Sequence, residues 1–414
     1  MPTLLILGNF IITHKYFLVK FKGKTLNYPC KAVFFWYTKG VVNNLKEAIM
    51  EKKIIKLGVV GLKRGAYVAW TLIGDDNVVI RAIADSDPAA LKSCKEDYEK
   101  NGVKDLLCFD SIEELLKSDI DAVYIATDKP LHTRHTVMAL EAGKHVLSEI
   151  PVIETIDEVK ILYDAVKSHP ELKYMAGENC FYWAFIEKWK EMHEAGKFGD
   201  ILYAESEYLH APHPDEIKPY NPENHWRKYN PAITYLTHNL GPLLYIMDDY
   251  PISVSCMAPN AARYNQYSKG DENGIAIFKT AKGAVIRIFI GFGMYVGYDH
   301  NFALYGTKGS ILTDKTKPLE EATSFAKLYD VPNTFEKYFE IPVKLSETDD
   351  VYGHGGVDAK MIRDFIRCII DDTAPPIDVE MGIRISLPGI IANESAKLGG
   401  ELMKIPTIED LIKD

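Results

Sequence analysis

Between Lys53 and Gly177 the sequence alternates short apolar runs with helix-forming segments, and this alternation constrains the fold more than any other feature. Short apolar runs that end in glycine or in turn residues are typical of buried parallel strands. Asp87 followed by Pro88 is a helix start, with a capping side chain before a proline at the first helical position. Repeated strand–helix units predict an α/β Rossmann domain, a doubly wound parallel sheet with helices on both faces. We expect its strands at residues 54–61, 78–84, 122–126, 145–148 and 173–177.

The pattern changes after about Phe198, where longer strands of alternating residues follow one another. The segments 281–283 and 307–309 end in glycine between such strands and predict hairpin turns. We expect helices at 233–247 and 358–371, followed by a proline-marked tail. This half therefore predicts an α+β domain with a mostly antiparallel open sheet. The expected domain boundaries are an N-terminal extension at 1–49, a nucleotide-binding domain at 50–172 and the α+β domain at 173–414.

The first 49 residues differ from the rest, since Glu47 is their only acidic residue. A targeting segment built on residues 3–12 is one interpretation, but no basic residues precede that apolar stretch and no convincing cleavage site follows it. We favour an extension read from upstream of a true start at Met50, which directly precedes the first predicted strand.

Composition excludes several classes of protein. The net charge of −10 argues against a nucleic-acid partner, because a phosphate backbone favours a basic surface. No apolar run is long enough to span a membrane. The six cysteines form no Cys-x-x-Cys pair, which argues against structural zinc and fits a reducing cytoplasm.

A glycine-containing loop between the first predicted strand and helix predicts a dinucleotide site. Gly61 suits the tight turn, and Gly65 allows close approach of a pyrophosphate, whereas Lys63 replaces the usual middle glycine. Asp85 ends the second strand, where an acid binds the ribose hydroxyls of NAD and repels the phosphate of NADP. We therefore expect NAD, although Lys63 and Arg64 leave NADP open. The alternative is an ordinary strand-to-helix turn.

Two stretches, 126–132 and 139–146, resemble the Gfo/Idh/MocA oxidoreductases. The resemblance covers nearly everything from Lys53 onward. It implies a Rossmann domain joined to an open antiparallel sheet, which serves for substrate binding and for contacts in a homo-oligomer. The family usually carries Glu-Lys-Pro after this stretch, and its lysine serves proton transfer. Here the triplet is Glu149-Ile150-Pro151, and isoleucine cannot carry a proton.

Three further motifs, 178–182, 235–242 and 353–358, resemble glycoside hydrolase family 109, which includes α-N-acetylgalactosaminidases. The resemblance implies an NAD-dependent glycoside-processing enzyme acting on a sugar or glycoside. Cleavage would proceed by transient oxidation at C3, elimination across C1 and C2, hydration and reduction. The alternatives are an NAD-dependent sugar dehydrogenase that forms a ketosugar, and an inactive NAD-binding regulator on the same fold.

His238 is the first candidate for proton transfer, because imidazole titrates near neutral pH and the residue lies on a predicted helix. Tyr182 is the second, since a phenol can relay a proton. Tyr235 and Arg227 are candidates for substrate binding, as is His354 in its glycine-rich turn. The ordinary alternatives are a core histidine, aromatic packing at a domain junction for Tyr182, a surface salt bridge for Arg227 and a loop-capping role for His354.

Three more residues are expected at the carboxyl ends of the strands, where open parallel sheets bind ligands, and the resemblance implies that Glu149 contacts the nicotinamide ribose. Lys129 lies in the same stretch and could substitute as a proton carrier, although a solvated lysine is the simpler interpretation. No cluster has convincing metal-ligand spacing, so we expect no metal; His210, His213 and Asp215 lie in an irregular loop. The four expected cofactor residues are Thr127, His132, Glu149 and Asn179.

Overall fold

The computed structural model describes residues 53–259, 263–317, 323–342 and 356–413, together with four short strands near the N-terminus. The chain divides into two units, 1–53 and 54–414, and each is described by itself. In the first unit four antiparallel strands pair in sequence order. They are β1 (Leu5–Leu7), β2 (Phe10–Ile12), β3 (Tyr16–Phe21) and β4 (Lys24–Pro29).

A parallel six-stranded sheet forms the first half of the second unit, in the order β10-β9-β8-β5-β6-β7. The order reverses between β5 and β8, and ligands of doubly wound sheets bind at such a switch point. The predicted Rossmann domain is thus confirmed, with β7 as an extra strand that its short, half-buried sequence did not reveal. The strands are β5 (Ile55–Val60), β6 (Val78–Ala84), β7 (Leu107–Phe109), β8 (Ala122–Ile125), β9 (His145–Ser148) and β10 (Tyr174–Ala176).

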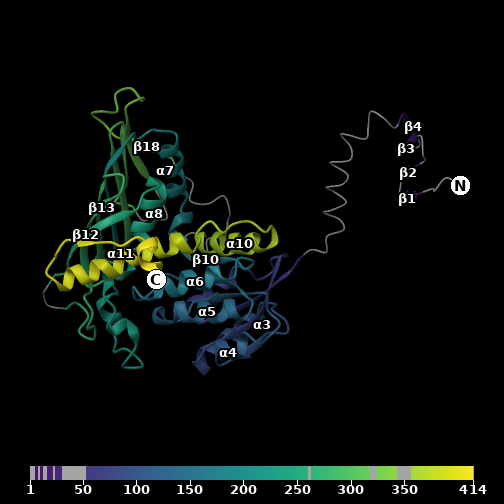
Figure 1. Ribbon diagram of the computed structural model, residues 1–414, viewed down its shortest axis with the longest axis horizontal. Helices are drawn as coiled ribbons and strands as arrows, with labels where there is room; N and C mark the ends of the chain where they lie inside the picture. The colour runs from purple at the N-terminus through teal and green to yellow at the C-terminus, as the bar shows by residue number, and fades with distance from the viewer. Residues whose placement is uncertain are drawn as a thin grey trace. The chain divides into compact units, whose positions relative to one another are not determined.

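Helices cover this sheet, as Figure 1 shows for α3 to α6. The Asp87 side chain accepts a hydrogen bond from the Ala89 amide at 2.9 Å, so the predicted helix cap is present. β10 pairs with β9, so the parallel sheet extends beyond the expected boundary at residue 172. The helices are α2 (Arg64–Trp70), α3 (Pro88–Lys100), α4 (Ile112–Leu115), α5 (His132–Glu141) and α6 (Glu158–Lys167).

A nine-stranded sheet forms the second half, in the order β18-β17-β16-β15-β11-β14-β13-β12-β19. All its pairs are antiparallel except β11 with β14, and both predicted hairpins are present. Its strands are β11 (Ile201–His210), β12 (Pro251–Met257), β13 (Asn273–Thr280), β14 (Val285–Gly291), β15 (Tyr298–Gly306), β16 (Gly309–Thr313), β17 (Ser324–Leu328), β18 (Phe339–Ile341) and β19 (Met403–Lys404).

Alternating burial along β13 shows that this sheet has one covered and one open face. Ala276 and Phe278 are fully buried beneath the helices, whereas Ile275 and Ile277 are 43% and 50% exposed on the other face. Exposed isoleucines at alternate positions of one strand, on the same face of the sheet, are unusual for a surface that contacts only water. The open sheet predicted from the sequence is therefore present.

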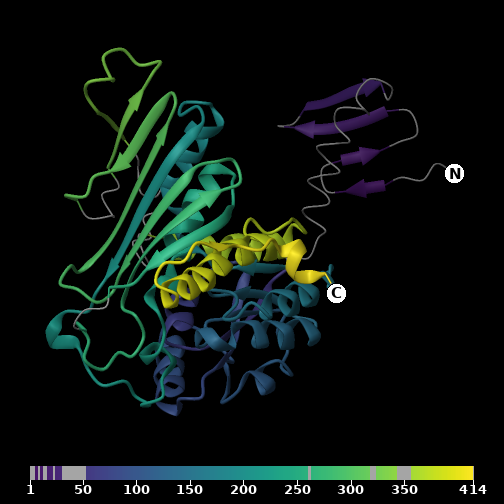
Figure 2. The ribbon, with the colours of Figure 1, turned by 60° about the vertical axis from the view of Figure 1, so that its left-hand side comes forward.

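Helices on the covered face of the large sheet join it to the Rossmann part. α11 contacts β12 of the large sheet as well as β10 and α6, and Figure 2 shows α10 and α11 in yellow between the two sheets. None of the described helices is both long and apolar enough to cross a membrane. The helices are α7 (Ala184–Glu194), α8 (Thr237–Met247), α10 (Val357–Ile370), α11 (Val379–Lys397) and α12 (Ile408–Ile412).

The prediction of a proline-marked tail was wrong, because α11 continues through Pro388 for 19 residues. A proline inside a helix removes one backbone hydrogen bond and normally disfavours the helix. Here burial compensates, since Ile383, Leu387 and Ile391 are at most 4% exposed. Gly389 also allows close packing, as a Cβ there would lie 3.1 Å from the Cα of Thr234.

Candidate functional site

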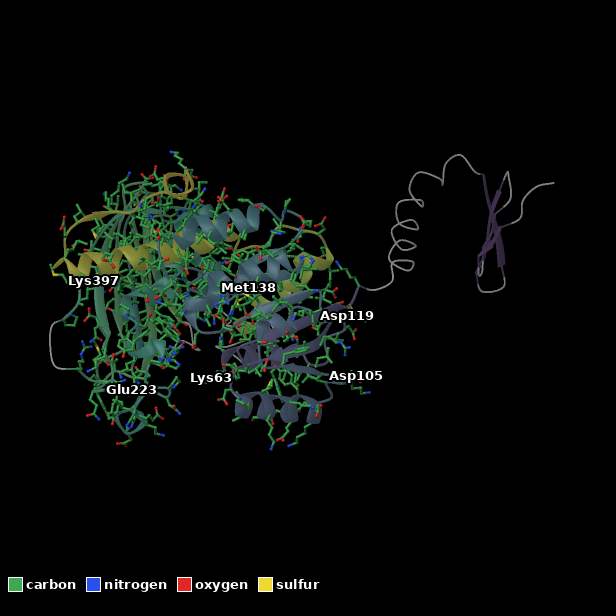
Figure 3. The ribbon with its side chains drawn as sticks, turned by 60° about the horizontal axis from the view of Figure 1, so that its bottom comes forward. Lys63, Asp105, Asp119, Met138, Glu223 and Lys397 are labelled. Carbon is green, nitrogen blue, oxygen red and sulfur yellow. The ribbon has the colours of Figure 1, made fainter. Side chains whose placement is uncertain are left out.

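The glycine loop after β5 has the geometry that a dinucleotide loop requires. Gly61 adopts a φ of +84°, and a Cβ there would lie 2.3 Å from the carbonyl oxygen of Ala126. Gly65 contributes mainly to helix–strand packing, because its Cβ would lie 2.9 Å from Val59 and 3.1 Å from Ala126. Lys63 is exposed, and Figure 3 places it on the side of the Rossmann part that faces away from Asp119.

Asp85 fixes this loop from the end of β6. Its two carboxylate oxygens accept hydrogen bonds from the amides of Leu62, at 2.7 Å, and Asp87, at 2.9 Å. A carboxylate has about four acceptor positions, so lone pairs remain for two ribose hydroxyls. The strand end, the left-handed glycine and the oriented acid therefore suit the adenosine half of NAD.

We expect Gly61→Ala to abolish measurable NAD binding and to lower stability by about 2 kcal/mol or more, since a left-handed non-glycine costs roughly 1–3 kcal/mol before the clash with Ala126 is added. Isothermal titration with NAD and urea denaturation would measure both effects. Gly143→Ala is the matched control, because Gly143 also has a positive φ, of +71°, but nothing lies within 4 Å of its Cβ. It should lose stability while keeping NAD affinity, and equal affinities for the two variants would contradict the assignment.

A buried ion-pair network lies beside the loop. Arg64 donates two hydrogen bonds to the buried Asp358 of α10, at 2.7 and 2.6 Å, and a third to Glu149 at 3.1 Å. Tyr124 on β8 also donates to Glu149. Burial lowers the pKa of Arg64, but the surrounding carboxylates outweigh it and the net pKa is raised. Arg64 and Glu149, both expected at the cofactor, are thus paired with each other in this structure.

The network continues to the predicted catalytic histidine. The Asn179 side chain donates to Asp358 at 2.8 Å, and Glu178 lies two residues after the end of β10. Oε1 of Glu178 lies 2.8 Å from Nδ1 of His238, at the start of α8. Glu178 is fully buried, whereas the His238 side chain is 18% exposed. The pair thus joins the strand ends of the Rossmann sheet to the second half of the chain.

Glu178 sets the proton affinity of His238. Burial lowers the pKa of His238, but the charge and hydrogen bond of Glu178, with a further contribution from Glu149, raise it above its ordinary value. Because Nδ1 faces Glu178, Nε2 is the nitrogen left for a ligand, and no residue in the described part of the chain bonds it. The arrangement suits a proton-transfer group oriented by a carboxylate.

An aromatic wall continues from His238 toward the surface. The rings of His238, Tyr235 and Trp226 lie nearly parallel, with centroids 6.4 and 6.3 Å apart in turn. The Arg227 guanidinium lies 4.6 Å from the centre of the Trp226 ring and is exposed. Tyr235 belongs to the short helix η5 (Ala232–Tyr235), and Trp226 and Arg227 to η4 (Trp226–Lys228). These are the polar and aromatic groups that sugar-binding sites employ.

The structure does not bring Tyr182 to this group. Its ring is 7% exposed, Lys360 lies 5.6 Å from the ring centre, and the charges that act on its hydroxyl are led by Asp364 of α10. Burial raises the pKa of Tyr182, which makes it a poor proton donor. Its position at the end of the short helix η2 (Asn179–Tyr182) turns the phenol toward α10, while Glu178 faces α8.

The predicted residues that remain are His132, Thr127 and His354. His132 is buried, and its ring nitrogens face the carbonyl oxygens of Pro151 and Thr127 at 2.8 and 2.9 Å, so it fixes the strand ends. The Thr127 hydroxyl contacts His135 at 3.0 Å. His354 lies outside the described residues.

Sequence reasoning missed three residues of the site. Glu178 and Asp358 stand inside the motifs that carried the resemblance, but their partners lie far away in sequence. Trp226 directly precedes Arg227, which was predicted to bind the substrate. Lys129 was expected in solvent and is instead 4% exposed, so that expectation was wrong.

Glu178, Cys180 and His238 also place ligand-type atoms within 4.8 Å of one another. The Cys180 sulfur lies 3.3 Å from Nδ1 of His238, and the Cys180 amide donates to Glu178 at 3.1 Å. Burial raises the pKa of the Cys180 thiol, which keeps it neutral. Hydrogen bonds within the trio account for its spacing.

A Rossmann domain with this loop, joined to a large open sheet, is an architecture typical of nucleotide-dependent oxidoreductases. Residues 55–177 match the model described as the oxidoreductase family with an NAD-binding Rossmann fold, and 186–312 match the Gfo/Idh/MocA C-terminal domain. The two models together span more than half of the chain, which belongs to the Gfo/Idh/MocA family of NAD-dependent oxidoreductases.

Relatives named glycosyl hydrolase family 109 proteins confirm the resemblance. One from Solibacter usitatus is 27% identical over 85% of this chain and 87% of its own length. One from Bacteroides fragilis is 28% identical over 79% of both chains. The fold is similar to levoglucosan dehydrogenase in complex with NADH and levoglucosan, with a TM-score of 0.73, 20% identity and coverage of 86% and 100%. It is also similar to Lactobacillus casei scyllo-inositol dehydrogenase with NAD(H) and scyllo-inositol, with a TM-score of 0.70, 20% identity and coverage of 85% and 99%.

Proposed function

We propose that the protein is an NAD-dependent glycoside-processing enzyme, which cleaves its substrate through transient oxidation of the sugar. The observation that carries the proposal is the hydrogen bond of 2.8 Å between His238 and Glu178 beside the nucleotide loop. The family's usual lysine position holds Ile150, which is only 5% exposed and carries no proton. The histidine–glutamate pair is therefore the best available proton-transfer device in the described site.

When bound, NAD would supply a hydride acceptor for sugar C3 and, at the end of the cycle, a hydride donor. The neutral imidazole of His238 accepts the proton of the C3 hydroxyl, and Glu178 stabilises the imidazolium that forms. The resulting ketone acidifies the C2 proton, so the C1 leaving group departs with that proton as an alcohol. Water would then add across C1 and C2, and return of a hydride and a proton to C3 would give net hydrolysis.

The aromatic wall supports a sugar as the substrate. Trp226 and Tyr235 present nearly parallel rings, against which the apolar face of a pyranose can stack. The exposed Arg227 has donors for sugar oxygens at the rim. In this proposal Tyr235 and Arg227 bind the substrate, and Asp85, Gly61 and the loop amides hold the cofactor.

The test is incubation of the pure protein with a panel of aryl glycosides, with and without added NAD. We expect aglycone release without net accumulation of NADH, because the hydride returns to the sugar in each turnover. Enzyme stripped of its cofactor should lose activity and regain it with NAD. Aglycone release that is indifferent to NAD after stripping would overturn the proposal.

A dehydrogenase that releases NADH is the second candidate. The similarity to levoglucosan and scyllo-inositol dehydrogenases favours it, since those proteins are named for oxidising such compounds. The same assay separates the two, because a dehydrogenase accumulates NADH and a ketosugar in proportion to time. An NAD-binding regulator would turn over neither kind of substrate.

We also propose that the open face of the large sheet is covered in a homo-oligomer. Met257, Ile275 and Ile277 are 62%, 43% and 50% exposed there. Apolar side chains gathered on one sheet face mark an interface between proteins.

Ile277→Glu should convert that oligomer to smaller species in sedimentation velocity, because a charge buried in an interface is strongly unfavourable. Ile161→Glu is the control, since Ile161 on α6 is similarly exposed, at 52%, but lies outside the sheet. A wild-type protein that sediments as a monomer would contradict this proposal.

For the compartment we propose the cytoplasm, consistent with the five free cysteines among the described residues.

A further inference from the structure

Lys129 occupies an environment that a lysine rarely has. It follows β8 in the short helix η1 (Lys129–Leu131) and is 4% exposed; no other lysine in the described part of the chain is buried. Its Nζ lies 2.6 Å from Oε2 of Glu154, in the segment after β9. Removing an ammonium group from water costs several kcal/mol unless partners compensate, so the contacts of Nζ must be strong.

Two further contacts of Lys129 reach the other half of the chain. Nζ donates to the side-chain oxygen of Asn230 and, at 3.2 Å, to the hydroxyl of Thr234. It also lies 5.8 Å from the centre of the Trp226 ring. The ammonium group therefore connects the end of β8, the segment after β9 and the segment 226–235, which carries Trp226, Arg227 and Tyr235.

The segment 226–235 is otherwise held by its own turns and by its own half of the chain, where η5 packs on α11, β13 and β14 and the Lys228 carbonyl accepts from the amides of Lys269 and Gly270. The Thr234 hydroxyl donates to the carbonyl of Pro231 at 2.8 Å, and the amide of Ala232 donates to Asp271 at 2.7 Å. Those bonds fix its local shape but tie it to neighbours in its own half. The side-chain hydrogen bonds of Lys129 link Asn230 and Thr234, among the described residues, to the nucleotide-binding half.

We infer that Lys129 is a positioning residue that fixes the segment 226–235 against the Rossmann strands, so that the rings of Trp226 and Tyr235 meet His238 in line. Lys129 acts on the site through Glu154, Asn230, Thr234 and the Trp226 ring, which are its contacts among the described residues. The inference differs from the proton-carrier role considered from sequence. It rests on the proposed function only where sugar binding is measured.

The first experiment measures the segment directly by hydrogen–deuterium exchange of the full-length protein. Lys129→Met keeps the length of the side chain but removes the charge and the donors. Loss of hydrogen bonds to a charged group is worth about 1.5–3 kcal/mol, so amides of 226–236 should exchange about tenfold faster or more. Peptides of β14 should not change. Lys56→Met is the control, because the Lys56–Asp119 pair is exposed at the far end of the same sheet.

A double variant separates positioning from simple charge burial. Lys129→Met leaves Glu154 without its cation, which alone would lower stability. Lys129→Met/Glu154→Gln removes both charges, so its melting temperature should return toward wild type while exchange in 226–236 stays fast. If the double variant restores slow exchange, or if Lys129→Met leaves exchange unchanged, the inference is wrong.

Binding measurements then connect the segment to the site. In the double variant we expect the KM for an active aryl glycoside to rise about tenfold, with kcat reduced less and the Kd for NAD within about twofold of wild type. Lys129→Arg keeps a donor for Asn230 and should recover part of the KM. A wild-type KM in the double variant would overturn the positioning role. Absence of any glycoside turnover in the wild type would refute the proposed function, and the exchange result would still decide the inference.

Discussion

Replacing His238 with asparagine should lower kcat on an active glycoside by about a thousandfold, since positioned acid–base groups contribute roughly 10²–10⁴-fold. Asparagine retains a donor that can reach Glu178, so the buried carboxylate does not lose its partner entirely. The affinity for NAD should change little, because the nucleotide loop and Asp85 lie in the other half of the chain. Single-turnover kinetics together with NAD titration would measure the two effects separately.

Two comparisons make this prediction specific. His213→Asn is the matched control, because the His213 side chain is 58% exposed in the loop between β11 and η4 and should leave kcat unchanged. Glu178→Gln removes the charge that raises the pKa of His238. Its pH–rate profile should therefore move the limb governed by His238 to lower pH. An unchanged limb, or full activity of His238→Asn, would show that another group transfers the proton.

Asp358→Asn should lower the free energy of unfolding by about 3 kcal/mol, because breaking a buried ion pair leaves a charge uncompensated. Asp358 has no exposed surface and accepts two hydrogen bonds from Arg64 and one from Asn179. Arg64 is 28% exposed and keeps its contact with Glu149, so the loss should lie at the lower end of the range for buried pairs. Urea denaturation monitored by circular dichroism would measure it.

The matched control lies on the same helix. Asp364 pairs with Arg367 at 3.3 Å on α10, where the two side chains are 25% and 71% exposed, and pairs that water reaches contribute about 0–1 kcal/mol. Asp364→Asn should therefore be nearly neutral. The prediction has a second readout, because Arg64 released from Asp358 should weaken NAD binding by disturbing the adjacent loop. Equal stabilities for Asp358→Asn and Asp364→Asn would contradict the network described for α10.

Lys129 illustrates the limit of reading residue type alone. A lysine after a strand is usually solvated, and nothing nearby in the sequence distinguished this one. Its partners Asn230 and Thr234 stand 101 and 105 residues further along the chain. At Pro388 the sequence predicted too little structure. A proline disfavours an isolated helix, so a tail was expected, but burial of α11 stabilises the helix through that position.

The sequence by itself determined the strand–helix alternation, the order of the elements and the glycine loop with its acid at Asp85, because these follow from local periodicity and from backbone conformations that few residues adopt. Only the tertiary structure decided which side chains meet. Arg64 and Asp358 are 294 residues apart, and Glu178 and His238 are 60 residues apart. Such pairs form where two sheets and the helices between them converge, and no local pattern in the chain encodes that convergence.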